Sequence, residues 1–184
     1  HVKKNVGIRK LFGSRHFPYF IQDEHTTRND GRTENSALQK QRGFYMDYRK
    51  FGNVIVARMD RGEEILEQIK IIALKENIKL ASISALGATD DFTVGVYNVD
   101  EKKYYSNEFK GNFEIVSLTG TINTMNGEFY THVHMSAGNE KGEVFGGHLN
   151  RAVISATCEM IITLVDGNVD RYRDENIGLN LFKF

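Results

Sequence analysis

The sequence predicts an α+β fold, a compact single domain in which one main helix packs on a largely antiparallel β-sheet. Only one stretch, residues 60–77, has apolar residues at helical spacing. Most of the chain after it consists of short apolar or alternating runs, separated by turn signals such as Asn126-Gly127 and Asp166-Gly167. Its composition, 40% hydrophobic and 26% charged residues, is ordinary for a globular protein.

The first organised elements are a strand and the helix. Val54-Ile-Val-Ala57 is typical of a buried strand. The helix is expected to begin at Asp60, since Asp60 and Glu63 fit a capping box, and to end near Asn77. The residues that trace its apolar face are Ile65, Leu66, Ile69, Ile72 and Ala73. This part of the chain is therefore expected to have a structural role and to contribute no catalytic or binding residues.

Strands are expected in the remainder of the chain. Most runs are too short for helices and are bounded by glycine or asparagine. In order, the predicted strands cover residues 80–86, 92–97, 103–108, 111–122, 129–136, 152–165, 169–173 and 179–184. Hairpin spacing between most of these strands favours antiparallel pairing.

The first 45 residues differ from the rest. They contain the chain's one proline and no sustained hydrophobic period. Residues 1–45 are therefore interpreted as a poorly structured N-terminal extension or a tag-derived tail, and 46–184 as the folded domain. The basic, acid-free first 22 residues leave an organelle transit peptide open, and Met46 is a candidate natural start.

Charge and cysteine content narrow the classes of function. Residues 1–45 carry nine Lys/Arg against four Asp/Glu, a net +5, so the remainder is net −5. An acidic body is a poor surface for binding phosphates, so DNA is a less favoured partner. The single cysteine, Cys158, excludes an intrachain disulfide and a cysteine-based zinc framework. A single cysteine fits a reducing compartment. Since no apolar run reaches the length of a membrane span either, a cytoplasmic location is expected.

The most informative stretch is residues 131–149, with three of the six histidines and four of the 17 glycines. Its start alternates, so His132 and His134 should project from the same face of a strand. A glycine-containing turn follows, and Gly146-Gly147 allows close backbone approach before His148. The turn should bring His148 back to the two imidazoles of His132 and His134. This arrangement of three imidazoles predicts a metal site.

Three neutral imidazoles leave one coordination position open, as in catalytic or ligand-binding sites and unlike closed structural ones. Zinc is the expected metal, although nickel, iron or copper would also suit imidazole ligands. A small-molecule ligand at the metal is therefore expected as well. The alternative is that these strand histidines are purely structural.

Two acids interrupt apolar strand patterns, Glu114 and Glu159. Either they face solvent, or they line the histidine pocket as a fourth ligand or as a general base on metal-bound water. They are the candidate catalytic residues. Phosphate-binding loops, dinucleotide fingerprints, serine-hydrolase elbows and Cys-x-x-Cys motifs are absent from the sequence.

The chain also resembles the PPC domain family, conserved in plants and prokaryotes. The matching pieces are Arg58-Met-Asp-Arg-Gly-Glu-Glu-Ile, Ala85-Leu-Gly-Ala88, Gly111-Asn-Phe-Glu-Ile-Val-Ser-Leu-Thr-Gly120, His132-Val-His134, Gly142-Glu-Val-Phe-Gly-Gly-His-Leu149 and Asp174-Glu-Asn-Ile-Gly178. They lie in order over about residues 46–184. The histidines match the prokaryotic type of the family, and the Arg-Gly-Arg-Pro AT-hook of the plant members has no counterpart here.

The resemblance implies a compact α+β domain that assembles as a homotrimer. It also implies a likeness in fold to acetolactate decarboxylase, where three histidines hold zinc. Three hypotheses follow: a trimeric metal-binding protein, a DNA-associated regulatory module, and an oligomeric interaction domain with structural histidines. Whether the chain is an enzyme stays open at this stage.

Overall fold

The computed structural model describes residues 46–184, so the predictions for residues 1–45 lie outside the described residues. The described part contains one α-helix, eight β-strands and short turns. They are β1 (Asp47–Phe51), β2 (Val54–Asp60), α2 (Ile65–Lys75), β3 (Ala81–Asn98), β4 (Lys103–Met125), β5 (Glu128–Gly138), β6 (Val144–Leu164), β7 (Asp170–Asp174) and β8 (Leu179–Lys183). The predicted α+β class is confirmed.

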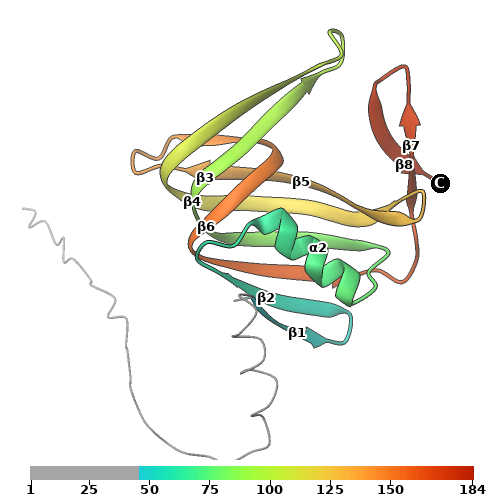
Figure 1. Cartoon of the computed structure of the whole chain (residues 1–184), viewed down its shortest axis with the longest axis horizontal. Coiled ribbons are helices and arrows are strands. Elements are labelled where there is room, and N and C mark those ends of the chain that lie inside the picture. The colour runs from blue at the N-terminus through green and yellow to red at the C-terminus, as the bar shows by residue number, and fades with distance from the viewer. Residues whose placement is uncertain (1–45) are drawn as a thin grey trace, which may run out of the picture.

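Six strands form one antiparallel sheet in the order β1-β2-β6-β3-β4-β5. The first residues of β6 also pair with the end of β5, so the pairings of β3, β4, β5 and β6 close on themselves. Figure 1 shows the result, a curved sheet with α2 across one face and the separate β7–β8 hairpin beside it. No helix among residues 46–184 is long and apolar enough to cross a membrane.

Several predicted strands are segments of longer ones. The predicted strands 80–86 and 92–97 are one strand, β3, with register shifts on both sides of Thr89. Gly87 permits this continuity, because a Cβ at this position would lie 2.3 Å from the carbonyl oxygen of Thr157 on β6. Strand β4 likewise joins two predicted segments across a β-bulge. Strand β1 was not predicted, and none of its five residues is buried in the structure.

The predicted helix start at Asp60 is wrong. Helix α2 begins at Ile65, and the Glu64 side chain caps it by accepting a hydrogen bond from the Glu67 backbone N–H. The predicted contact between Asp60 and Glu63 exists, at 2.6 Å, but it lies in the turn before the helix. The backbone of residues 62–64 bonds to β6 through two hydrogen bonds and an isolated bridge, which keeps these residues out of the helix.

The core lies between α2 and the inner face of the sheet. The helix buries Ile65, Ile69 and Ile72 completely, as its apolar spacing predicts. A row of cross-strand partners faces it: Ile55, Ile162, Ile83, Gly120 and Val133. Burial of aliphatic side chains of this size stabilises a fold by roughly 1.5–3 kcal/mol each.

The neighbouring row of cross-strand partners has the opposite parity and therefore points away from this core. Its members are Val56, Ile161, Ser84, Thr119 and His134, on β2, β6, β3, β4 and β5. We call the side of the sheet that carries this row the outer face. The outer face holds both cavities described below.

The β7–β8 hairpin is attached to the ends of β4 and β5. The Thr124 backbone N–H donates to the Val169 carbonyl oxygen just before β7, and its hydroxyl donates to Asn168 Oδ1 or Asp170 Oδ1. Asn180 of β8 donates to the Tyr130 hydroxyl. These contacts place the hairpin over one end of the outer face. Residues 170–183 therefore form one wall of the histidine cavity.

Candidate metal centre

His132 and His134 lie on β5 and point to the outer face, while Val133 and Met135 are buried on the other side. The opposite residues on β4 are Thr121 and Thr119. Period-two alternation of a strand is sufficient to place both imidazoles on one face, as the sequence predicts.

His148 reaches the same point from β6. The turn after β5 reverses the chain, and His148 becomes the direct cross-strand partner of His134. The preceding glycines are required for this approach. A Cβ at Gly146 would lie 2.8 Å from the Met135 carbonyl oxygen, and one at Gly147 would lie 2.5 Å from that of Gly95. Since real Cβ atoms do not approach so closely, larger residues would push β6 away from its neighbours.

The three imidazoles are close enough to share one ion. One nitrogen from each ring lies within 4.8 Å of the others, and the Nε2 atoms of His132 and His134 are 3.2 Å apart. Tetrahedral zinc with Zn–N distances of about 2.0–2.1 Å requires N–N separations of roughly 3.3 Å. One pair already has this spacing, and a ring nitrogen of His148 lies within 4.8 Å of the other two rings' ligand atoms.

The surroundings favour neutral imidazoles, the form that binds metals. Burial lowers the pKa of His132 to about 4, helped by the neighbouring His148, His134 and Arg171. Burial also lowers the pKa of His148, and His134 adds to the effect. Protons are thus weak competitors for these two rings at neutral pH.

The histidines lie in a cavity of ≈ 990 Å³ between β5, the first part of β6 and the β7–β8 hairpin. No aspartate or glutamate is among its lining residues. Tyr104 lies beside His148, with its hydroxyl donating to the His148 carbonyl oxygen or to Asn150. The cavity therefore combines three clustered imidazoles with tyrosines and arginines, and no carboxylate lines it.

Among the cavity residues that the sequence did not point to, the most informative is Arg171 on β7. It is only 6% exposed and lines the histidine cavity. In the sequence it is one of two arginines in a short polar strand, a pattern typical of a solvent-exposed hairpin. Only the docking of that hairpin against β4 and β5 buries it, so no local signal could have identified it.

The two candidate catalytic acids lie elsewhere. Glu159 is opposite Arg58 and Leu86 on the outer face and lines the second cavity. Glu114 is exposed on β4, opposite Ala88 and Gly138, and lines neither cavity. The structure thus brings the three histidines together and leaves both glutamates out of their cavity.

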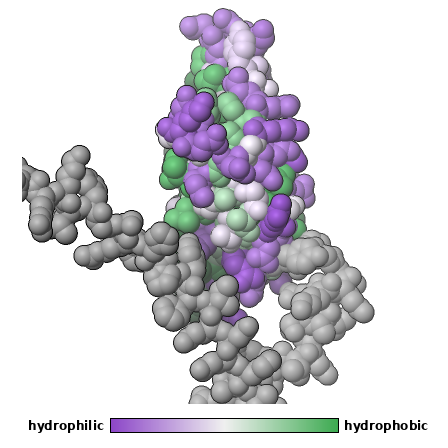
Figure 2. Space-filling view, turned by 90° about the vertical axis from the view of Figure 1, so that its left-hand side faces the viewer, coloured by the Kyte–Doolittle hydropathy of each residue, from purple (hydrophilic) through white to green (hydrophobic). Residues whose placement is uncertain are grey.

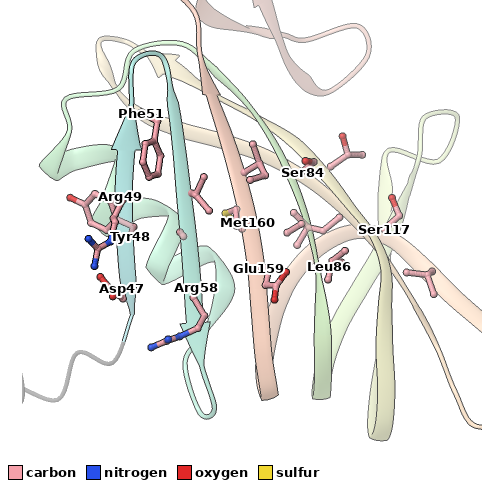
Figure 3. A pocket seen from close by; sticks show the side chains of 17 residues that line it. Asp47, Tyr48, Arg49, Phe51, Arg58, Ser84, Leu86, Ser117, Glu159 and Met160 are labelled. Carbon is pink, nitrogen blue, oxygen red and sulfur yellow. The ribbon is translucent and has the colours of Figure 1, made fainter. Parts of the chain in front are cut away.

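The second cavity, of ≈ 730 Å³, lies over β1, β2, β6, β3 and β4 on the same outer face, with Thr119 lining both. Its wall includes the exposed apolar side chains Val56, Leu86, Val116 and Ile161. Figure 3 shows it from close by, with Arg58, Glu159 and Leu86 on neighbouring strands. We call this region the apolar cavity. The side of the molecule in Figure 2 instead shows hydrophilic side chains with scattered apolar patches between them.

Together the fold and the site define a class of protein: a small α+β domain with three clustered histidines on the outer face of its sheet. Residues 46–166 match the model of the Plants and Prokaryotes Conserved (PCC) domain. This is the family called PPC above. The chain therefore belongs to this family. The match ends before β7 and β8, so Arg171 lies outside the matched residues.

Solved structures have the same fold. A metal-containing protein from Archaeoglobus fulgidus is 30% identical, with 77% of this chain and 98% of that chain covered and a TM-score of 0.66. A plant- and prokaryote-conserved protein from Pyrococcus horikoshii is also 30% identical, with 76% and 94% covered and a TM-score of 0.66. A proposed DNA-binding protein from Bacteroides thetaiotaomicron is 27% identical, with 76% and 97% covered and a TM-score of 0.74. Among curated proteins, none matches this chain.

Proposed function

We propose that the protein is a metal-binding PPC protein of the prokaryotic three-histidine type. His132, His134 and His148 would hold one divalent ion, zinc by preference, with one coordination position open for a small molecule. The observation that supports this most is geometric: three ligand atoms from two strands lie within 4.8 Å of one another. The metal-containing relative from A. fulgidus is consistent with it.

Bound zinc would supply Lewis acidity at the open position. This chain's residues would hold the ion in the cavity that β5, β6 and the β7–β8 hairpin line. The likeness to acetolactate decarboxylase belongs to the same proposal, as an analogy of fold and ligand set that transfers no substrate. The third hypothesis, purely structural histidines, would require the rings to pack without a metal.

The test is the metal content of protein purified without a nickel column. We expect about one equivalent of zinc per chain, and a near-complete loss in His132→Ala, His134→Ala and His148→Ala. Circular dichroism should be unchanged in these variants, because the core lies on the other face of the sheet. A metal-free wild type that takes up no zinc, nickel, iron or copper would reject the proposal and favour structural histidines.

We also propose that the protein is a homotrimer, with the apolar cavity in its interface. Monomeric proteins rarely leave extended apolar patches exposed, and this one contains Leu86 at 58% and Val116 at 56% exposure. Charges of both signs, Arg58 and Glu159, border the patch and would allow copies to pair. Light scattering should give three times the chain mass of 21.0 kDa. A monomer at micromolar concentration would contradict the trimer.

DNA association is the second candidate function, favoured by the proposed DNA-binding relative from B. thetaiotaomicron. The net charge of −5 on residues 46–184 argues against it. A mobility-shift titration at two salt concentrations, on the whole chain and on residues 46–184 alone, separates the two candidates. Submicromolar, salt-tolerant binding by residues 46–184 would put the DNA-associated module first. Binding that needs residues 1–45 and falls steeply with salt would assign it to the basic segment.

A cytoplasmic location is part of the same proposal. Cys158 is buried and free, and burial raises its pKa to about 12, so it resists oxidation in any compartment. The support for the cytoplasm is therefore the absence of cysteine pairs from the sequence. Cell fractionation with an antibody against the chain would test it.

A further inference from the structure

Arg171 is a buried cation in the wall of the histidine cavity. Its side chain lies between two aromatic rings, with the guanidinium carbon 4.7 Å from the centre of the Tyr130 ring and 4.3 Å from that of Phe182. Such stacking holds the guanidinium plane in one orientation. The group is thus rigidly placed and almost fully removed from solvent.

Its hydrogen bonds leave part of the guanidinium group free. Nε donates to Asn123 Oδ1 at 3.1 Å and Nη1 donates to the Asn180 carbonyl oxygen at 2.7 Å. Both acceptors are neutral, and within residues 46–184 Nη2 has no hydrogen-bond partner in the protein. One edge of the fork is therefore available to a ligand.

Arg171 also lacks a counter-charge within the described part of the chain, where no carboxylate lies within 4.0 Å of it. Two exposed arginines do have one: Arg58 is 2.9 Å from Asp60, and Arg151 is 2.9 Å from Asp91. This distribution is the reverse of what desolvation favours, since a buried charge needs a partner far more than an exposed one.

The rest of the cavity increases the positive charge. Arg173 lines it too, and its nearest acid, Glu175, is a highly exposed residue 4.0 Å away. A divalent ion on three neutral imidazoles would keep its full charge of two. With no acid among the lining residues, the loaded cavity would lack any balancing anion.

The cavity wall also contains apolar side chains. They come mainly from the hairpin and from β3 and β5: Val96, Tyr130, Leu179, Leu181 and Phe182. Such a wall suits the carbon skeleton of an organic molecule better than a fully hydrated inorganic anion.

We propose that the cavity binds a small organic carboxylate, with its carboxylate paired to Arg171 and a second oxygen at the open position of the metal. This inference rests on the proposed metal site and names the class of its ligand. Carboxylate geometry matches the guanidinium fork, and charge-assisted bonds of this kind are about twice as strong as neutral ones. The ligand supplies the counter-charge that the described protein residues do not.

The whole chain loaded with cobalt allows a direct test, because the visible spectrum of cobalt reports on its open position. Malonate, with a carboxylate for each end of the site, is the probe. We expect saturable spectral changes with malonate, and roughly 10- to 100-fold weaker binding in Arg171→Gln, with cobalt content unchanged. Arg151→Gln is the matched control, since this exposed arginine lies outside the cavity, and it should bind malonate as the wild type does.

Two further arms test the chemistry of the ligand. Malonamide, which has the same skeleton without charge, should bind far more weakly than malonate. Inorganic phosphate tests whether any oxyanion is enough; binding of phosphate as tight as that of malonate would overturn the organic part of the proposal. If Arg171→Gln does not fold, Arg171→Lys keeps the charge without the fork and should still weaken malonate binding.

The failures are distinguishable. A wild type that binds no metal would reject both the metal site and the carboxylate. Normal cobalt uptake with equal malonate affinity in wild type and Arg171 variants would overturn the carboxylate proposal alone. The carboxylate proposal would also be overturned if malonate caused no spectral change in the cobalt-loaded wild type, for example because an acid of another copy already neutralises Arg171.

Discussion

The outer face of the sheet carries two cavities that share Thr119 but differ in chemistry. The apolar cavity is lined by exposed aliphatic side chains, and its border has acids and bases in similar number. The histidine cavity contains imidazoles and arginines and no acid. The first has the composition of a protein–protein contact, and the second that of a site for a metal and an anion. One face of a sheet can therefore carry two different sites, because its outward-pointing side chains do not pack in the core between the helix and the sheet.

The largest expected difference between the cavities is in stabilisation by zinc. Zinc at 100 times its Kd should raise the free energy of unfolding by about 2.7 kcal/mol, because it binds the folded state. His134→Ala should abolish this rise by removing one of three ligands. Glu159→Gln, in the apolar cavity, should retain all of it. Thermal unfolding with and without zinc measures both, and a zinc-dependent rise that survives His134→Ala would contradict the assignment of the two cavities.

The reciprocal substitution concerns assembly. Leu86→Asp puts a charge into the apolar cavity and should convert the trimer to monomers, because an unpaired carboxylate cannot be buried between copies. Zinc content per chain should stay near one, since Leu86 does not line the histidine cavity. Light scattering and metal analysis of the same sample provide the two readouts.

Val99→Asp is the matched control for this experiment. Val99 is an exposed aliphatic residue in the turn between β3 and β4, outside both cavities. It should leave the trimer intact. Equal disruption by both variants would indicate a general charge effect and would remove the apolar cavity from the interface.

A smaller effect is expected from the backbone that brings β6 to the histidines. Gly147→Ala forces a methyl group to within 2.5 Å of the Gly95 carbonyl oxygen, so β6 must shift. We expect a loss of about 1–3 kcal/mol in the free energy of unfolding, together with weaker zinc binding. Gly138→Ala is the control: its Cβ would meet only ordinary contacts at 3.7 Å or more. Denaturant unfolding should show a change of less than about 0.5 kcal/mol for that variant.

The smallest effect lies at the end of helix α2, away from the histidine cavity. The hydrogen bond from the Tyr48 hydroxyl, opposed by desolvation and helped by Lys50, lowers the pKa of Glu76 below its usual 4.5. The unfolded state therefore takes up this proton at higher pH than the folded state. The resulting stability is complete above pH 4.5 and is lost as the pH falls through the lower, folded-state pKa.

Glu76→Gln should therefore flatten the acid limb of stability against pH by less than about 1 kcal/mol, with zinc binding unchanged at neutral pH. Denaturant midpoints measured between neutral pH and pH 3 would show it. An acid limb identical to that of the wild type would mean that the Glu76 pairs contribute nothing to stability.

The local pattern of the sequence determined the α+β class, the apolar face of α2 and the common face of His132 and His134. Period 3.6 and period 2 are properties of neighbouring residues, so no distant contact is needed to infer them. The turn and the two glycines before His148 also predicted that a third imidazole would return to the other two.

The tertiary structure decided everything that depends on distant segments. Helix α2 begins at Ile65 because the residues before it are bonded to β6. Glu159 lies in the apolar cavity because it pairs opposite Arg58 of β2. This register between two strands cannot be inferred from the sequence of β6 alone. Arg171 is buried beside the histidines only because a hairpin some 40 residues further along the chain docks there. Burial and charge pairing are properties of the folded surroundings, and so the anionic class of ligand became visible only in three dimensions.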